Sequence, residues 1–330
     1  MRIRASRTPF GVLAFVLFLA ACGGNSGSAV APHTSANVPG SGVLPPAFSG
    51  SLTTATHNVV YLSDIDGRPG KGQILAYPAS LDAKNPPLAR TILRGAIRPI
   101  GLWVDSAGTL YAANIPNGFP TNGVEEYQPG ATTPFRELKE DLAAPTAVAV
   151  AADGTVYVND GGVGCSTDVC VVIFPAGSVH ASAKIPVPIT GYAHGAGQLA
   201  FDKRGNVLVA ASTFRTGLEI FKLNPVTHDV SKLDVNVGTG FADGIATDAA
   251  GNLYVTTNGG GIAVFPPGAK HPARTTTRGG TAIWAMPDGT LYVATGGGVD
   301  EYKPGANAPF NTITATPPMQ GFGVAVGPDR

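Results

Sequence analysis

Short apolar segments alternate with turns that contain Asp and Gly along most of this chain. A strand-like segment, a turn and a second strand-like segment occur together five times, at 101–114, 147–160, 198–212, 244–258 and 282–295. Each copy is followed by a third apolar segment that ends in Tyr or Phe, and a fourth segment with alternating polar positions comes next. Because period-2 alternation bounded by turn residues is typical of β-strands, the pattern predicts repeated units of four short antiparallel strands.

The spacing of these units predicts their architecture. The turn glycines are 46, 51, 46 and 38 residues apart, and four-stranded units at such a period are typical of the blades of a β-propeller. The aromatic end of the third segment occurs six times, at Tyr77, Tyr127, Phe174, Phe221, Phe265 and Tyr302. We therefore expect an all-β fold, a six-bladed β-propeller of four-stranded antiparallel blades over residues 53–330.

The two ends of the repeated region predict how the ring closes. Residues 323–330 reproduce the first strand and turn of a unit, and residues 58–64 reproduce a second strand with no first strand before it. We expect the carboxy-terminal strand to complete the amino-terminal blade. A solenoid of β units is the alternative, but it would leave both terminal half-units unpaired.

Several residue types within the repeats indicate structural roles. Asp105, Asp202 and Asp248 each stand three residues before a turn glycine. An aspartate there can accept hydrogen bonds from backbone amides, while Gly adopts a positive φ without a steric penalty. Trp103 and Trp284 offer aromatic surface for a ligand, but both fall in first strands, where a core position is the expectation.

The amino-terminal segment has the features of a processing signal. Arg2, Arg4 and Arg7 precede an uncharged apolar run over 10–21 that is too short to span a bilayer, so residues 1–21 predict a secretory signal peptide. The run ends in Leu-Ala-Ala-Cys-Gly, which resembles the lipobox of bacterial lipoproteins. The resemblance implies cleavage before Cys22 and acylation of its thiol. An ordinary signal peptide that contains a Cys is the alternative.

Residues 22–52 are expected to form the lipidated Cys and a flexible tether, because Gly, Ser, Ala, Pro and Thr dominate there without an apolar period. The lipoprotein resemblance implies a location outside the cytoplasm, with the lipid as membrane anchor. Gly23 stands where Asp would retain such a lipoprotein in the inner membrane. It therefore favours the outer membrane of a Gram-negative cell, or otherwise the outer face of the plasma membrane.

Composition and charge narrow the function classes. The chain has 22 Lys and Arg against 22 Asp and Glu, and removal of the three signal-peptide arginines leaves a net charge of −3. That balance does not favour a nucleic-acid partner. The 44 glycines have no collagen period and match the frequent turns of the repeats.

Two cysteines, Cys165 and Cys170, remain once Cys22 is lipidated, and we expect them to form a disulfide in an oxidising compartment. A metal site is the alternative, but a C-x₄-C spacing with no His nearby supplies too few ligands. The six histidines show no metal-binding spacing. His194 precedes a first strand and should lie near a channel mouth, where it is either a candidate ligand-binding residue or a solvated loop residue.

The repeated D-x-x-G-N-L-Y-V pattern resembles NHL-repeat propellers and the gluconolactonase/senescence-marker family, over roughly residues 53–330. Lactonases of that family hold a divalent cation on the propeller axis through Glu, Asn, Asn and Asp, each eight residues before a turn glycine. The equivalent positions in this chain are Ile100, Thr146, Gly197, Asp243, Thr281 and Phe322. Only Asp243 matches, so the resemblance implies the architecture but not the lactonase metal site.

These observations favour a cell-envelope propeller that acts as a monomeric binding scaffold for a protein, peptide or glycan, rather than an enzyme. No catalytic residue, metal ligand or cofactor is expected, although a divalent cation at Asp243 stays open. Candidate ligand-binding residues are Asp243, Thr146 and His194. The alternative is a hydrolase-, lactonase- or lyase-like enzyme with a divergent axial site around Asp243, and a passive structural component of the envelope is a third possibility.

Overall fold

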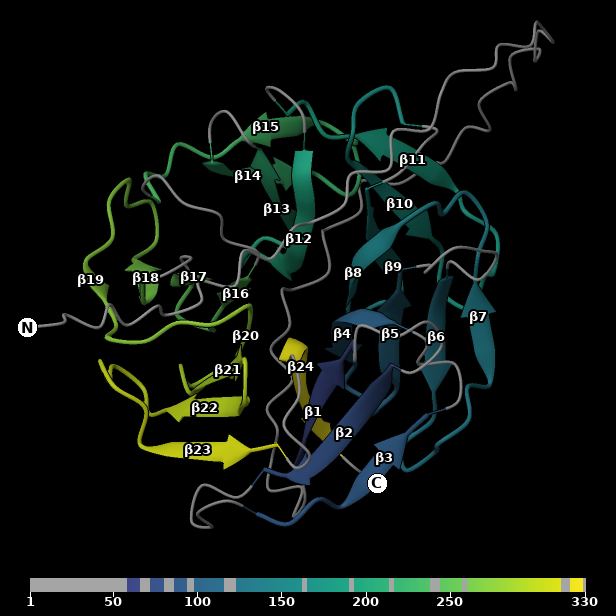
Figure 1. Cartoon of the computed structure of the whole chain (residues 1–330). Helices are drawn as coiled ribbons and strands as arrows, with labels where there is room; N and C mark the ends of the chain where they lie inside the picture. The colour runs from purple at the N-terminus through teal and green to yellow at the C-terminus, as the bar shows by residue number, and fades with distance from the viewer. Residues whose placement is uncertain are drawn as a thin grey trace, which may run out of the picture. The chain divides into compact units, whose positions relative to one another are not determined.

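The computed structural model describes residues 58–65, 72–79, 86–93, 98–115, 123–161, 165–189, 193–213, 217–237, 244–256, 260–315 and 321–328. Within them, 24 strands form six four-stranded antiparallel sheets. The sheets stand around a centre like the blades of a propeller, as Figure 1 shows. The expected six-bladed β-propeller is therefore confirmed.

Each blade contributes one strand to each of four concentric positions. The inner strands are β24 (Gly321–Pro328), β4 (Pro99–Val104), β8 (Pro145–Val150), β12 (Ala193–Phe201), β16 (Ile245–Thr247) and β20 (Ala282–Ala285). The second strands are β1 (Asn58–Asp64), β5 (Leu110–Asn114), β9 (Val156–Asp160), β13 (Val207–Thr213), β17 (Leu253–Thr256) and β21 (Leu291–Thr295). The third strands are β2 (Gln73–Pro78), β6 (Gly123–Tyr127), β10 (Cys170–Phe174), β14 (Gly217–Leu223), β18 (Ile262–Phe265) and β22 (Gly298–Tyr302). The outer strands are β3 (Arg90–Ile92), β7 (Arg136–Leu138), β11 (Ala183–Pro186), β15 (Val230–Lys232), β19 (Arg274–Thr275) and β23 (Asn311–Thr314).

The ring closes through strands from opposite ends of the repeated region. β24 pairs antiparallel with β1, placing Val326 opposite Val60 and Val324 opposite Leu62. β24 also contacts the inner strands β4 and β20 on either side of it. The expectation that the carboxy-terminal strand completes the amino-terminal blade is confirmed, and an open solenoid is excluded.

The hydrophobic core consists of six clusters, one between each pair of neighbouring blades. Each cluster contains one of the aromatic residues that end the third strands, and all six aromatic side chains are fully buried. Burying a large apolar side chain stabilises a fold by about 1.5–3 kcal/mol, so this recurring position contributes at every blade interface. The period of the sequence therefore reflects a repeated packing requirement.

The turns after the inner strands have the geometry expected of them. Asp105 Oδ1 accepts hydrogen bonds from the amides of Ala107 (2.9 Å) and Thr109 (2.8 Å), and the glycine that completes this turn, Gly108, has φ +89°. The carboxylates of Asp202 and Asp248 accept backbone amides in the same way. These aspartates hold the turns, as expected.

A bulge in β12 is supported by the neighbouring blade. The pairing of β12 with β13 shifts register between Ala196 and Leu199, so that Gly197 and Gln198 together face Ala210. The Nδ2 group of Asn159, fully buried in β9, donates to the carbonyls of Gly197 (2.7 Å) and Ala210 (3.3 Å). A bulge leaves backbone groups outside the ladder, and this side chain satisfies them across the blade interface.

The expected disulfide is present between Cys165 and Cys170, whose Cα atoms are 6.0 Å apart. Cys170 begins β10 and is fully buried, so the bond ties the preceding segment to a core strand. No helix in the described part of the chain is long and apolar enough to cross a membrane. Residues 1–57, which include the expected signal peptide, Cys22 and the tether, lie outside the described residues.

Candidate functional site

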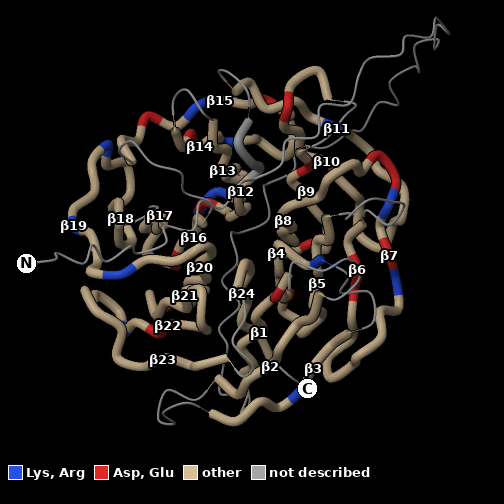
Figure 2. Tube along the Cα trace, viewed as in Figure 1, with Lys and Arg blue, Asp and Glu red and all other residues tan. Residues whose placement is uncertain are grey.

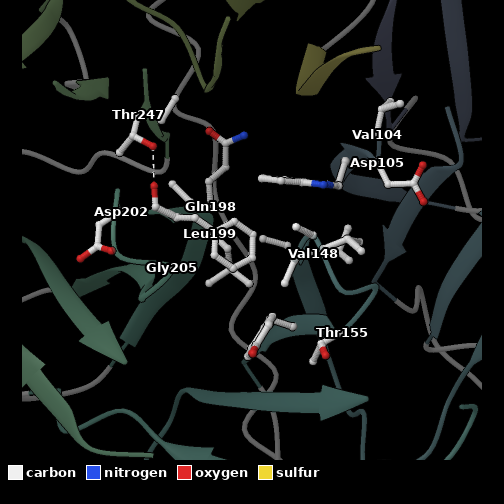
Figure 3. Close-up of a pocket in the computed structure, with 18 of the residues that line it drawn as sticks. Val104, Asp105, Val148, Thr155, Gln198, Leu199, Asp202, Gly205 and Thr247 are labelled. Atoms are coloured by element: carbon white, nitrogen blue, oxygen red, sulfur yellow. Dashed lines mark hydrogen bonds between the residues drawn. The ribbon is translucent and has the colours of Figure 1, made fainter. Parts of the chain in front are cut away.

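A hollow of the described structure lies on the propeller axis. It has a volume of about 680 Å³, and all six inner strands line it. Most lining residues come from the carboxyl-terminal part of an inner strand or from the turn that follows, as in residues 101–106 in and after β4 and residues 283–287 in and after β20. Figure 3 shows side chains from these strands around this space, which we call the axial cavity. It therefore opens on the face of the propeller that carries the Asp-Gly turns.

A contiguous aromatic cluster forms part of the cavity wall. Trp103 packs edge-to-face on Trp284, with ring centroids 4.9 Å apart and planes at 65°. Trp103 also contacts Phe201 at 5.7 Å, and Phe201 contacts Tyr157 at 5.9 Å, with planes near perpendicular. All four residues line the cavity, and each comes from a different blade. Burial, together with the charge of Asp153, raises the pKa of Tyr157 to about 12, so its phenol stays neutral at physiological pH.

Gln198 supplies a polar group at the wall of this apolar space. It belongs to the bulge of β12, and its Oε1 accepts a hydrogen bond from the amide of Ile283 in β20 (2.9 Å). Figure 3 shows the Gln198 side chain reaching into the cavity. Because the oxygen is engaged, the Nε2 amino group is the part of this side chain that can donate to a ligand.

Charged residues are confined to the rim of the axial cavity. None of the six inner strands contains Lys, Arg, Asp or Glu. Figure 2 shows the charged residues, in blue and red, along the tube of the whole propeller. The charged lining residues are four aspartates, one lysine and one arginine, which stand in or beside the turns and give the lining a net charge of −2. They are Asp105, Asp153, Asp202, Asp248, Lys203 and Arg204. His228, exposed in the turn between β14 and β15, also reaches the rim.

The tryptophans belong partly to the core and partly to the cavity. Trp103 and Trp284 are half-buried and pack against the core clusters between blades, and both also line the axial cavity. The physical reason is that an inner strand has one end at the open face of the ring, where its last side chains meet the axis as well as the neighbouring blades. Both tryptophans stand five residues before a turn glycine. This shared position in the repeat is the feature of the sequence that indicates their common place at the cavity.

Of the three sequence-derived ligand candidates, only Thr146 has a described side chain, and it is not among the residues that line this cavity. Thr146 lies at the amino-terminal end of β8, and its Oγ1 donates to the carbonyl of Asn159 (3.1 Å) within the same blade. His194 lies in the amino-terminal half of β12, and its side chain is outside the described part of the structure. Asp243 lies outside the described residues as well.

The described residues offer binding surface more clearly than catalytic groups. Among them, no group of three or more His, Cys, Asp and Glu side chains is placed to hold a metal ion. The rim aspartates are engaged in the turns. Asp202 accepts hydrogen bonds from two backbone amides and from Asn206 Nδ2, and Asp248 accepts from one backbone amide, from Asn252 Nδ2 and from the hydroxyl of Tyr254. These carboxylates contribute negative charge at the rim while their oxygens are largely committed.

Comparison with known proteins supports the fold. No protein-family model and no curated protein matches the chain. Among solved structures, one from a nidogen/laminin complex aligns with a TM-score of 0.62 at 13% identity, over 82% of this chain and 98% of that chain. The hydrazine synthase of Kuenenia stuttgartiensis aligns with a TM-score of 0.54 at 15% identity, over 71% of this chain and 76% of that chain. A protein assigned as a gluconolactonase aligns with a TM-score of 0.47 at 18% identity, over 75% and 93%.

At identities this low, the likenesses to the first two structures concern the fold alone. They agree with the propeller architecture that the repeats predict and that the six sheets display. The class that fold and site define together is a six-bladed β-propeller with an aromatic-lined axial cavity.

Proposed function

We propose that this protein is a lipid-anchored binding protein of the cell envelope that holds its ligand in the axial cavity of the propeller. The observation that carries the proposal is the cavity itself: about 680 Å³ of space, lined by all six blades and walled in part by four aromatic side chains. Ligand sites are typically concave, largely apolar and equipped with a few polar groups, and the cavity has these properties.

The location outside the cytoplasm rests on the amino-terminal sequence. A basic segment, a short apolar run and the lipobox-like residues before Cys22 support secretion and acylation. The disulfide between Cys165 and Cys170 supports an oxidising compartment. A diacylglyceryl group would supply the two chains that stable anchoring needs, and the tether would hold the propeller away from the lipid headgroups.

Anchoring is tested by growing cells that express the protein with a fatty-acid analogue. We expect label on the wild type and its loss in Cys22→Ser. Absence of label from the wild type, or equal label on the variant, would show that Cys22 is not acylated.

Ligand binding can be measured directly because the chain contains two tryptophans and both line the cavity. Tryptophan emission of the detergent-extracted full chain is followed during titration with panels of sugars, peptides, organic cations and lactones. We expect a saturable response to a ligand, weakened in Phe201→Leu. Phe135→Leu is the matched control, because Phe135 is an exposed phenylalanine, 52% accessible, that does not line the cavity.

The alternative, an enzyme built around Asp243, predicts a different result when the same protein sample is tested. Stoichiometric bound Ca²⁺ and turnover of a lactone that disappears in Asp243→Ala would replace a binding role with a catalytic one. If no ligand in any panel changes the tryptophan emission, the binding proposal loses its support.

A further inference from the structure

The axial cavity combines three features that together restrict the chemistry of its ligand: an aromatic wall, a negatively charged rim and few polar side chains on its inner strands. Resting on the proposed binding function, we propose that the cavity takes an organic cation that carries a quaternary ammonium group.

The aromatic wall suits a cation that has no hydrogen-bond donors. Trp284, Trp103, Phe201 and Tyr157 form a continuous chain of contacts in which successive rings stand at 65°, 81° and 78° to each other. Rings at such angles turn their faces and edges in several directions around one space. The face of an aromatic ring carries negative charge and attracts a cation, most strongly for Trp and most effectively where water is excluded.

The rim adds a negative electrostatic field, which attracts a cation. Four aspartates outnumber Lys203 and Arg204 among the charged lining residues. Because the inner strands carry no charged residue, the charge of the lining is set by the turns at its opening. A cleft with charge of one sign over apolar walls concentrates ligands of the opposite sign.

The hydrogen bonds that the rim carboxylates already accept favour one kind of cation over another. Asp105, Asp202 and Asp248 each accept hydrogen bonds from three protein groups, such as the two amides and the Tyr111 hydroxyl that reach Asp105. A carboxylate has about four acceptor sites, so these offer charge but little hydrogen-bonding capacity. At these three carboxylates a primary ammonium or guanidinium group would lose its water and find few free acceptors, and Asp153, which accepts the Thr155 amide, is exposed to solvent. A quaternary ammonium group has no donors to satisfy.

The inner strands supply only two polar side chains to the lining, Gln198 and Thr247, which is few for a sugar. Gln198 has its oxygen bound to the Ile283 amide, which leaves one amino group as donor. A sugar presents several hydroxyl groups, and each one buried without a partner costs free energy. The Thr247 hydroxyl is already used, since it donates to the carbonyl of Phe201 (2.5 Å), the bond drawn in Figure 3.

The test compares ligands of one shape and different charge on the detergent-extracted full chain. Choline carries a trimethylammonium group, 3,3-dimethylbutan-1-ol is its neutral isostere, and ethanolamine carries a primary ammonium group. Maltose represents a neutral sugar. Binding is read from tryptophan emission and confirmed by calorimetry. We expect choline to bind at least about tenfold more tightly than each of the other probes, as cation–π attraction by several rings implies.

Two rim variants test the charge without disturbing the aromatic wall. Asp153→Asn keeps the acceptor that binds the Thr155 amide (2.9 Å) and removes an exposed charge. Lys203→Met removes a positive charge and keeps the unbranched stem that lies over Gly251. At about 0.01 M salt, where the Debye length is about 30 Å, we expect Asp153→Asn to weaken choline binding about two- to threefold and Lys203→Met to strengthen it similarly. Neither variant should alter binding of the neutral isostere, and about 1 M salt should abolish both effects.

Trp284→Leu and Trp284→Phe test the wall, with Trp103 left as the reporter. The leucine variant should lose most of the preference for choline over its isostere, and the phenylalanine variant should keep part of it. Equal affinity for choline and the isostere, or tighter binding of ethanolamine or maltose, would overturn the ligand class while leaving a binding cavity. If none of the four probes changes the tryptophan emission, the ligand class is wrong. If the wider panels of ligands also give no change, the proposed binding function is wrong as well.

Discussion

The contact that Asn159 makes between two blades gives a prediction that joins the stability of the ring to the shape of the axial cavity. Asn159 is fully buried in β9, and its Nδ2 group donates to the carbonyls of Gly197 and Ala210 in the next blade. Gly197 is part of the bulge that presents Gln198 to the cavity, and Ala210 is the residue opposite that bulge. Asn159→Ala removes the donor without adding bulk.

The expected loss follows from the two hydrogen bonds. A typical protein hydrogen bond contributes about 0.5–1.5 kcal/mol, and a buried acceptor left without its partner costs about 1–3 kcal/mol. Alanine fits this strand position, because Ala113 and Ala210 stand equally far beyond the turn glycines of the two neighbouring blades. We therefore expect Asn159→Ala to lower the free energy of unfolding by about 2–4 kcal/mol. Asn159→Asp should lower it further, since a carboxylate cannot donate to either carbonyl.

Urea unfolding of the full chain, followed by tryptophan fluorescence, measures this loss. A double-mutant cycle with Gln198→Ala should show a coupling of about 0.5 kcal/mol or more, because both side chains act on the same bulge. Thr281→Ala is the control. The Thr281 hydroxyl donates to the carbonyl of Gly321 (2.8 Å) at the opposite blade interface. Because the two sites are far apart, the effect of Thr281→Ala on the free energy of unfolding should add to that of Asn159→Ala. A loss below about 0.5 kcal/mol, or no coupling to Gln198, would refute this account of the bulge.

Three further predictions concern other parts of the ring. Deletion of residues 321–330 removes β24 and leaves β1 without its partner, so unfolding in urea should lose its single cooperative transition; a retained sharp transition would contradict closure by this strand. Burial, and then the charge of Glu137, raises the pKa of Glu125 to about 9, so the folded protein holds a proton that the unfolded chain releases. The free energy of unfolding should therefore fall between about pH 5 and pH 9, by up to about 1.4 kcal/mol per pH unit, and Glu125→Gln should flatten this part of the pH profile; an unchanged profile would contradict it. Replacing both Cys165 and Cys170 by Ala should lower the free energy of unfolding by about 2 kcal/mol, as expected for a small closed loop, and reductant should lower that of the wild type alone.

The sequence predicted the blade architecture because the relevant signals are local. Alternating apolar positions, Asp-Gly turns and a recurring aromatic residue are each contained within one unit of 38–51 residues. The half-units at the two ends predicted the pairing of β24 with β1, and the two remaining cysteines predicted the disulfide. These inferences required no knowledge of how one blade meets another.

The candidate site depends on contacts that the repeat pattern does not encode. Trp103 and Trp284 are 181 positions apart in the sequence and come together only because the ring closes and brings β4 and β20 to a common axis. The bulge that places Gln198 is held by Asn159 from another blade. Periodicity shows which side chains leave the core of a blade, but only the closed ring determines which of them meet. The sequence alone therefore determined how this protein is built, and the tertiary structure decided where its cavity lies and which chemistry lines it.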